Sequence, residues 1–196
     1  MDPLHLPARC RATAFGAAAS FFAAACAALA FSMPAAAQSA SPIDLSVAAA
    51  AGSRVRVKKV EVDLGWMREQ PLWQGQDWRL RLRHEVALAE WRVPDARNIT
   101  EFGYSPVFRL ERPGASATFF AEGSIGARLL SHTRLAPHVP LSTAFQFADM
   151  LGVGMQWGQG VGAQTVGLRL QHQSNADIKK PNPGINFLML YYRYAF

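Results

Sequence analysis

Cysteine is rare in this sequence. The chain has only two cysteines, Cys10 and Cys26, and both lie in its N-terminal segment. We expect that segment to be removed, which leaves a mature chain without a thiol and excludes disulfides and cysteine catalysis. Cys26 follows three alanines, a poor match to a lipoprotein box, so we expect no lipid anchor there.

The N-terminal segment has the three parts of a secretory signal peptide. Arg9 and Arg11 precede the apolar run "ATAFGAAASFFAAACAALAFSM", and small residues follow in "PAAAQSA". A basic start, an apolar middle and an A-x-A end are typical of a cleaved signal peptide. We expect residues 1–37 to be removed after Ala37, which leaves one domain over 38–196. The alternative is an uncleaved transmembrane anchor, since the run is long enough to span a bilayer.

Long apolar runs are absent after residue 37, where no stretch reaches the ~20 residues that a membrane-spanning helix needs. Period-two alternation recurs instead, which indicates strands with two different faces. In 78–88, for example, Trp78, Leu80 and Leu82 share one face, while Arg79 and Arg81 share the other. The pattern predicts eight strands, at about 44–51, 55–67, 78–92, 99–112, 118–132, 145–158, 163–175 and 185–196.

The length and the ends of these strands favour a membrane barrel. The longer ones exceed the ~5–6 residues usual in soluble sheets and reach the ~9–11 that cross a bilayer at a tilt. The chain stops at "YYRYAF", and a terminal Phe196 on an alternating strand resembles the assembly signal of bacterial outer-membrane barrels, which the barrel assembly machinery recognises. Aromatic residues also gather near strand ends, as in interface girdles: Trp66, Trp73, Trp78, Trp91, Trp157, Tyr191, Tyr192 and Tyr194.

We therefore expect an all-β fold, an eight-stranded antiparallel transmembrane β-barrel in the outer membrane of a Gram-negative bacterium. An even number of strands can close without a free edge, which hydrocarbon requires. A soluble periplasmic sandwich with its apolar faces turned together is the alternative. Eight strands leave an interior just wide enough for side chains. The charged side chains expected to pair there are Glu61, Asp63, Arg79, Arg81, Arg83, Glu85, Glu101, Arg109, Glu122, Arg128, Arg169 and Arg193. They make a plug and not a pore, so any function must lie on the outside.

The formal net charge of +6 points to an anionic partner. For an exported protein we expect lipopolysaccharide phosphates and not nucleic acid, with Lys179 and Lys180 as candidate contacts. His132 and His138 have no carboxylate or cysteine at a matching spacing, so we expect no metal site. Asp149 shares the parity of the apolar residues of its strand, which places it either at headgroup level or at a functional contact.

The segment "LRLQHQSNADIKKPNPGINFLML" places His172 and Ser174 on the face that should be apolar. Residues two apart on a strand share a face, so these side chains can meet near the strand end. A hydroxyl beside an imidazole is the minimal machinery for attacking an ester. Polar residues at headgroup level without catalytic role are the plainer interpretation of the same spacing.

The wider segment "HQSNADIKKPNPGINFLMLYYRYAF" resembles the C-terminal signature of the PagL family, the lipid A 3-O-deacylases of Gram-negative outer membranes. The strand "FQFADMLGVGMQWG" at 145–158 is similar as well. The resemblance implies a cofactor-free, metal-free serine esterase that hydrolyses the ester of the 3-hydroxyacyl chain at position 3 of lipid A in the outer leaflet. It implies Ser174 as nucleophile and His172 as general base. Asn175 and Asn182 become candidates for the oxyanion hole.

This sequence departs from the family at the acid that orients the histidine, because that position is Asn186. An amide oxygen can hold the imidazole tautomer but cannot stabilise an imidazolium through charge. Asp177 is a possible substitute. The chain is then a slower enzyme, an enzyme with another third member, or a catalytically impaired or structural and adhesive barrel, which Asn186→Glu would separate by restoring activity. Another lipid enzyme, such as a phospholipase or palmitoyltransferase, is a further alternative, and a homodimer stays open.

Overall fold

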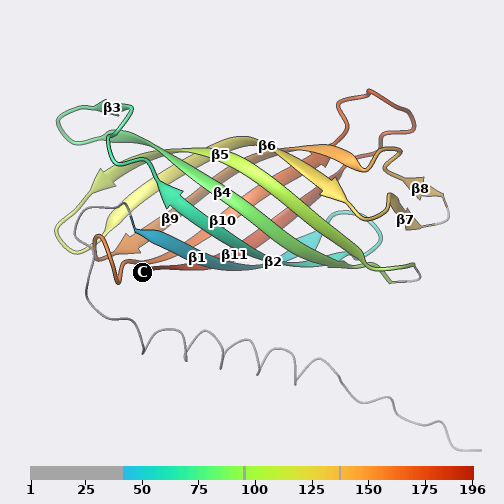
Figure 1. Cartoon of the computed structure of the whole chain (residues 1–196), viewed down its shortest axis with the longest axis horizontal. Helices are drawn as coiled ribbons and strands as arrows, with labels where there is room; N and C mark the ends of the chain where they lie inside the picture. The colour runs from blue at the N-terminus through green and yellow to red at the C-terminus, as the bar shows by residue number, and fades with distance from the viewer. Residues whose placement is uncertain (1–41, 95, 137) are drawn as a thin grey trace, which may run out of the picture. The chain divides into compact units, whose positions relative to one another are not determined.

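The computed structural model describes residues 42–94, 96–136 and 138–196. The expected signal peptide over 1–37 lies outside these described residues. No helix in the described part is long and apolar enough to cross a membrane. The described chain forms strands, turns and loops, and Figure 1 shows its long strands wound around one barrel.

Eight long strands make the barrel wall, as the alternation predicted. Each pairs antiparallel with its neighbours in the order β2-β1-β11-β10-β9-β6-β5-β4, and a further β2–β4 pairing closes the ring. The wall consists of β1 (Ile43–Gly52), β2 (Lys58–Met67), β4 (Arg79–Arg92), β5 (Ile99–Pro113), β6 (Thr118–Leu130), β9 (Phe145–Trp157), β10 (Gln164–Ser174) and β11 (Ile185–Ala195). The eight-stranded antiparallel fold expected from the sequence is therefore confirmed.

The strand boundaries differ from the prediction in two ways. The strand expected at 55–67 begins only at Lys58, because Val55 and Arg56 have φ of 41° and 52° and form a turn instead. Three short strands were not predicted: β3 (Trp73–Gln74) pairs antiparallel with the start of β4, while β7 (Arg134–Ala136) and β8 (Val139–Pro140) pair with each other. Short loop strands carry too few alternating positions to leave a pattern in the sequence.

The two ends of the barrel differ. Figure 1 shows β7, β8 and the loop between β10 and β11 at one end, and β3 with the C-terminus at the other. We call the end with β7 and β8 the loop end. The site described below lies on the outer wall near this loop end.

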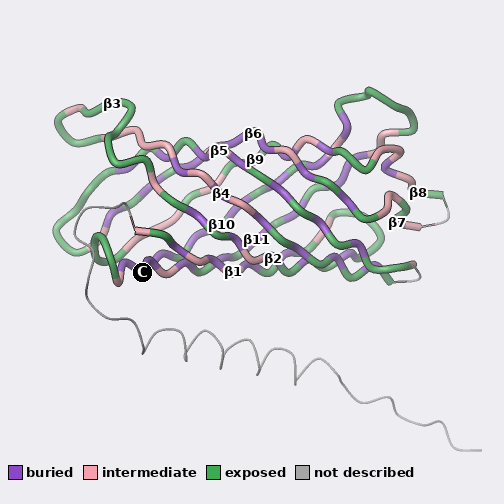
Figure 2. The backbone as a smooth tube through the Cα atoms, in the orientation of Figure 1, coloured by how far each residue is buried: buried purple, intermediate pink, exposed green. Residues whose placement is uncertain are grey.

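Buried and exposed residues alternate along the strands, as Figure 2 shows. The buried set includes most of the charged residues of the strands, and the exposed set is largely apolar. Leu88, Ile125, Leu151 and Leu170 are more than half exposed on the outer wall, while Arg83 is fully buried. The backbone of a closed barrel satisfies its own hydrogen bonds, so this inverted arrangement suits a lipid surround.

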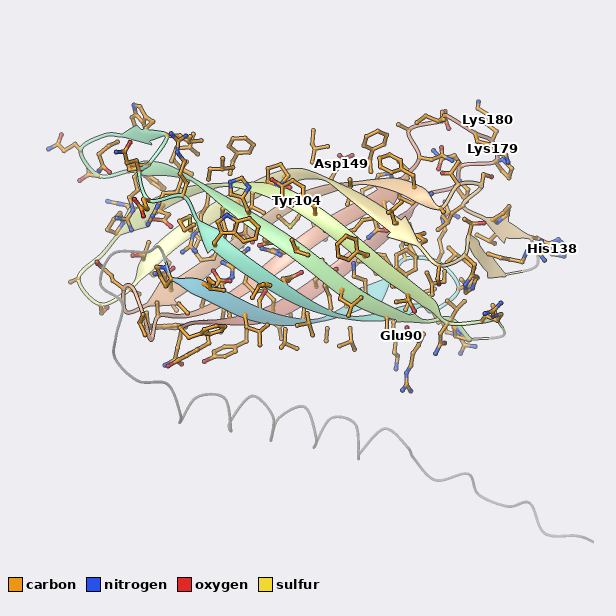
Figure 3. All side chains as sticks on the ribbon, viewed as in Figure 1. Glu90, Tyr104, His138, Asp149, Lys179 and Lys180 are labelled. Atoms are coloured by element: carbon orange, nitrogen blue, oxygen red, sulfur yellow. The ribbon has the colours of Figure 1, made fainter. Side chains whose placement is uncertain are left out.

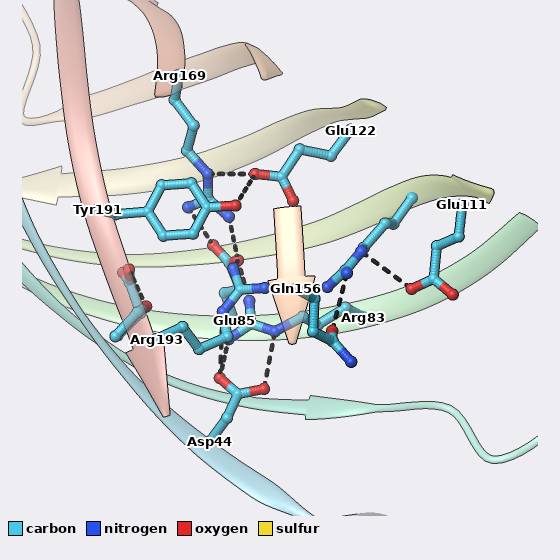
Figure 4. Close-up of polar contacts among 12 residues, drawn as sticks. Asp44, Arg83, Glu85, Glu111, Glu122, Gln156, Arg169, Tyr191 and Arg193 are labelled. Carbon is cyan, nitrogen blue, oxygen red and sulfur yellow. Dashed lines mark hydrogen bonds and ion pairs between the residues drawn. The ribbon is translucent and has the colours of Figure 1, made fainter. Parts of the chain in front are cut away.

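The interior holds a network of ion pairs, drawn in Figure 4. Arg169 donates to Glu122 at 2.6 Å and to Glu85 at 2.6 Å, and Arg193 reaches Glu85 at 3.1 Å. Arg83 pairs with Asp44 and Glu85. The predicted plug is present, because buried charges of both signs alternate across the lumen and offset each other's desolvation.

Two aromatic residues expected in the outer girdle lie inside the barrel. Trp91 is fully buried, donates from Nε1 to Glu101 at 2.6 Å and packs edge-on against Phe187. Tyr191 is also buried and donates its hydroxyl hydrogen to Glu122 at 3.0 Å. Both have the parity of the inward-facing residues on their strands, which outweighs their position near strand ends.

Candidate active site on the outer wall

The site begins with the way β10 is held from inside the barrel. Its inward residues Gln171 and Gln173 are buried, as is Asn175 directly after the strand, and its outward residues His172 and Ser174 lie between them. Gln173 donates from Nε2 to both carboxylate oxygens of Glu101, at 3.1 and 3.2 Å, and to the side-chain oxygen of Gln171 at 2.9 Å. These buried bonds fix the register of β10, and thereby the direction in which His172 and Ser174 point.

Asn186 orients the imidazole of His172. The two residues are direct partners across β10 and β11, and Nδ1 of His172 lies 2.6 Å from Oδ1 of Asn186. Because the amide oxygen can only accept, Nδ1 carries the proton and Nε2 keeps its lone pair. His172 is thus held in the tautomer that a general base requires.

The turn between β1 and β2 clamps this pair, a contribution that the sequence alone did not reveal. Ser53 accepts a hydrogen bond from the backbone N–H of Asn186 at 3.1 Å and donates its own N–H to the Asn186 carbonyl at 2.8 Å. Arg54 donates from Nε to the carbonyl of Gly184 at 2.8 Å and from Nη2 to that of Pro183 at 2.9 Å. The start of β11 is therefore fixed by a turn more than a hundred residues earlier in the chain.

Gly184 packs directly against the His172 ring. Its φ is +57°, and a Cβ there would lie 2.8 Å from Cε1 and 3.3 Å from Nε2 of His172. Glycine meets both demands, since it adopts positive φ without steric penalty and has no side chain to displace the ring.

Ser174 is half-buried on the same outer face as His172. Among the described residues, neither its hydroxyl nor Nε2 of His172 has a hydrogen-bond partner. A nucleophile and base without substrate often tighten their contact only when substrate binds. The two groups are thus available to each other and to a ligand.

The two oxyanion-hole candidates bond to other groups in this structure. The backbone N–H of Asn175 donates to Oδ1 of Asn182 at 3.2 Å. The Asn175 side-chain nitrogen donates to the carbonyls of Leu141 and Lys179, and Asn182 donates to Asp177 at 3.2 Å. These bonds brace the loop between β10 and β11, so an oxyanion role for Asn175 or Asn182 requires one of them to open and stays a prediction.

A groove of about 1010 Å³ runs from His172 and Asn186 across the outer wall. It passes from β11 and β10 over β9 and β6 to β5, and its lining is mainly apolar. The residues that line it are Pro106, Phe108, Gly123, Ser124, Ile125, Asp149, Met150, Leu151, Leu170, Gln171, His172 and Asn186. Gly123 adds no side chain to this surface, and the pairing of β5 with β6 is interrupted at Pro106. The groove has the form and polarity to receive a hydrocarbon chain.

The remaining candidate residues lie apart from this pair. Asp177 bonds to Asn182, not to His172, so the structure does not bring it in as a substitute acid. His132 contacts the Arg97 carbonyl at 3.0 Å, and no three His, Asp or Glu side chains of the described residues are grouped as metal ligands. Lys179 and Lys180 project together from the loop end in Figure 3.

Comparison with known proteins decides the family. A family model described as lipid A 3-O-deacylase (PagL) matches residues 58–195. The chain belongs to the PagL family. A "Lipid A deacylase PagL" of Bordetella bronchiseptica is 33% identical over 123 residues, which are 62% of this chain and 67% of that protein. The protein of the same name from Pseudomonas aeruginosa is 32% identical over 131 residues, 66% of this chain and 73% of its own length.

A solved structure agrees with this membership. The crystal structure of the outer membrane enzyme PagL superposes with a TM-score of 0.72 at 29% identity, over 78% of this chain and 99% of that one. The outer-membrane barrel predicted from the sequence is thereby confirmed, and the soluble sandwich is excluded. PagL membership also confirms the resemblance drawn from the C-terminal motif.

Proposed function

We propose that this PagL-family barrel is a lipid A 3-O-deacylase that uses Ser174 as a serine nucleophile. The observation that carries the proposal is the Nδ1–Oδ1 bond between His172 and Asn186 at the mouth of an apolar groove on the lipid-facing wall. A substrate that never leaves the leaflet can lay its acyl chain in that groove directly from the membrane.

The reaction follows from the tautomer of His172. Nε2 takes the proton of the Ser174 hydroxyl while Oγ attacks the ester carbonyl at position 3 of lipid A. The bond between the carbonyl carbon and the sugar oxygen breaks, and the imidazolium returns its proton to that oxygen. Water, deprotonated by the same nitrogen, then releases the 3-hydroxy fatty acid and restores Ser174.

Asn186 occupies the position of the family's acid and supports only part of its task. Its amide oxygen keeps Nδ1 protonated and the ring oriented, but a neutral amide offers little to the imidazolium that forms during attack. We therefore expect a deacylase slower than one with a carboxylate at this position. A catalytically impaired barrel is the second candidate, and the same asparagine is the observation that favours it.

Two further roles belong to this proposal. Residues 1–37 act as the cleaved signal peptide. Phe196, whose backbone N–H donates to the Ile43 carbonyl at 2.9 Å, directly follows β11 beside β1 and serves as the signal for the barrel assembly machinery.

Mass spectra of lipid A from cells that express the natural chain or Ser174→Ala test the proposal. Loss of one 3-hydroxyacyl mass with the natural chain alone is the expected result. Loss in both strains would keep an enzyme but move the nucleophile elsewhere, and lysophospholipid instead would indicate a phospholipase. Unchanged lipid A, with the barrel shown in the membrane by heat-modifiable gel migration, would favour the impaired barrel.

A further inference from the structure

Asp149 is the one acidic residue in the lining of the groove, and it lies beside the reaction centre. On β9 it pairs directly with His172 of β10 on one side and with Ile125 of β6 on the other. Neighbouring strands are ~4.8 Å apart, so Asp149 is the groove residue next to His172 on the adjacent strand. Figure 3 shows its side chain on the outward side of the wall.

The surroundings of Asp149 give its charge no partner. It is exposed on the outer wall, and among the described residues it forms neither a hydrogen bond nor an ion pair. The next side chains along the groove are apolar: Ile125, Leu151 and Leu170. A carboxylate on a lipid-facing wall is unfavourable, so a ligand that supplies a donor there gains a strong, charge-assisted bond.

The scissile acyl chain brings such a donor to this place. When the ester carbonyl lies at Ser174 and the tail lies among Leu151 and Leu170, the first polar group along the chain is the hydroxyl on its third carbon. Ser174 pairs with Phe147, two residues from Asp149, and such diagonal neighbours lie ~7–8 Å apart. That separation leaves room for the carbonyl carbon and two further carbons between the two side chains.

We propose that Asp149 is a specificity residue whose carboxylate accepts a hydrogen bond from the 3-hydroxyl of the scissile acyl chain. This inference rests on the proposed function, because it needs the ester carbonyl at Ser174. It makes esters of 3-hydroxy fatty acids the preferred substrates over esters of unsubstituted fatty acids. A site built to bind a hydroxyl discriminates strongly against the analogue that lacks it.

The test is a ratio measured on the purified full chain in detergent. The p-nitrophenyl esters of 3-hydroxydodecanoic and dodecanoic acid are compared by kcat/KM. The natural chain should prefer the hydroxylated ester about tenfold or more, the factor that one hydrogen bond to a charged group supplies. Asp149→Leu should bring the ratio close to one, and Asp149→Asn, which keeps an acceptor, should fall between. Ile125→Leu is the matched control from the neighbouring position of the groove and should leave the ratio unchanged.

The ratio separates this role from others, because loss of folded protein or of base strength affects both esters alike. An unchanged ratio in Asp149→Leu with both rates lowered would assign Asp149 to the support of His172 and overturn the inference. A natural chain without preference would also overturn it. Hydrolysis of both esters with the expected ratio, but without attack on lipid A, would refute the proposed substrate and keep the role of Asp149.

A binding measurement covers a chain that turns over neither ester. Calorimetry on Ser174→Ala with methyl 3-hydroxydodecanoate and methyl dodecanoate should show tighter binding of the hydroxylated ester by about the same factor. The double variant Ser174→Ala, Asp149→Leu should bind both equally. Equal binding by Ser174→Ala itself would refute the inference without any reference to catalysis.

Discussion

The His172 ring is held from two directions by groups of opposite character. Asn186 bonds Nδ1 at 2.6 Å, and Gly184 leaves the space against Cε1 that a Cβ would fill. The first contact sets the tautomer and the second sets the tilt of the ring. Each can be changed separately, so the residue scale allows two independent tests of the site.

Asn186→Asp should raise the rate of lipid A deacylation. The substitution keeps the acceptor oxygen at Nδ1 and adds a negative charge that stabilises the imidazolium. Loss of the carboxylate from a Ser-His-Asp triad lowers kcat by ~10⁴. We expect a gain of about tenfold or more in kcat, measured as 3-hydroxy fatty acid released over time. Asn186→Leu, which has the same branching and no acceptor, should lose activity. A slower Asn186→Asp would mean that the amide is not the weak member of this site.

Gly184→Ala should reduce activity about a hundredfold while the barrel stays folded, because a displacement of roughly 1 Å at a base has that effect. The matched control is Gly160→Ala. Gly160 also has a positive φ, +62°, but nothing lies within 4 Å of its Cβ position. Both variants carry the backbone strain of ~1–2 kcal/mol, and only the first moves His172. Equal activity of the two variants would show that a side chain at position 184 does not displace the His172 ring.

At the scale of the element, β10 has one face in the barrel interior and the other on the outer wall. Its inward residues bind a buried polar cluster, and its outward residues form the reaction centre, so the barrel interior acts on catalysis through one strand. Glu101 is central to that cluster: it accepts from Lys59 at 3.1 Å, from Trp91 at 2.6 Å and from Gln173.

Glu101→Ala should destabilise the barrel and lower activity together. It leaves Lys59 and Arg128 buried without their shared carboxylate, and removal of one partner from a buried ion pair destabilises by ~3–5 kcal/mol. The measurement is the temperature at which the folded band disappears on a semi-native gel. Glu90→Ala is the control, because Glu90 is exposed and contacts Thr100 only at 3.3 Å. Equal transition temperatures would show that the cluster does not stabilise β10.

The eight long strands, and the shared outward face of His172 and Ser174, could be predicted from the sequence, because both follow from local alternation. Alternation gives strand faces, and the spacing of His172 and Ser174 places them on one face. The contacts of Ser53 and Arg54, and the place of Asp149 opposite His172, could not be predicted, because they depend on register between segments that are distant in the chain. Trp91 shows the opposite case: its place near a strand end predicts the outer girdle, but its parity with Arg83 puts it in the interior.

For the whole molecule, the position of the site at the loop end implies a direction in the membrane. The groove opens to the outer leaflet only if that end faces outward and the end with the C-terminus faces the periplasm. The chain suits a direct test, because residues 38–196 contain no cysteine.

Single cysteines introduced at opposite ends should react differently with a membrane-impermeant maleimide. Lys179→Cys, in the loop between β10 and β11, should label in intact cells. Val161→Cys, which is exposed between β9 and β10 at the other end, should label only after lysis. The natural chain should not label at all once Cys10 and Cys26 have been removed with the signal peptide. The mass of the mature protein should correspond to a chain cleaved after Ala37. The reverse pattern would place the groove in the inner leaflet.

The groove crosses the strands instead of running along them, so each of five strands supplies one to three of its lining residues. Phe108, Ile125, Leu151 and Leu170 come from four different strands. The length of acyl chain that the groove accepts is therefore set in steps of one strand spacing, about 4.8 Å. A bulkier side chain on β5 or β6 would shorten the accepted acyl chain by one such step and leave the hairpin of His172 and Ser174 unchanged. Acyl-length preference in this barrel can then change by single substitutions, independently of the chemistry.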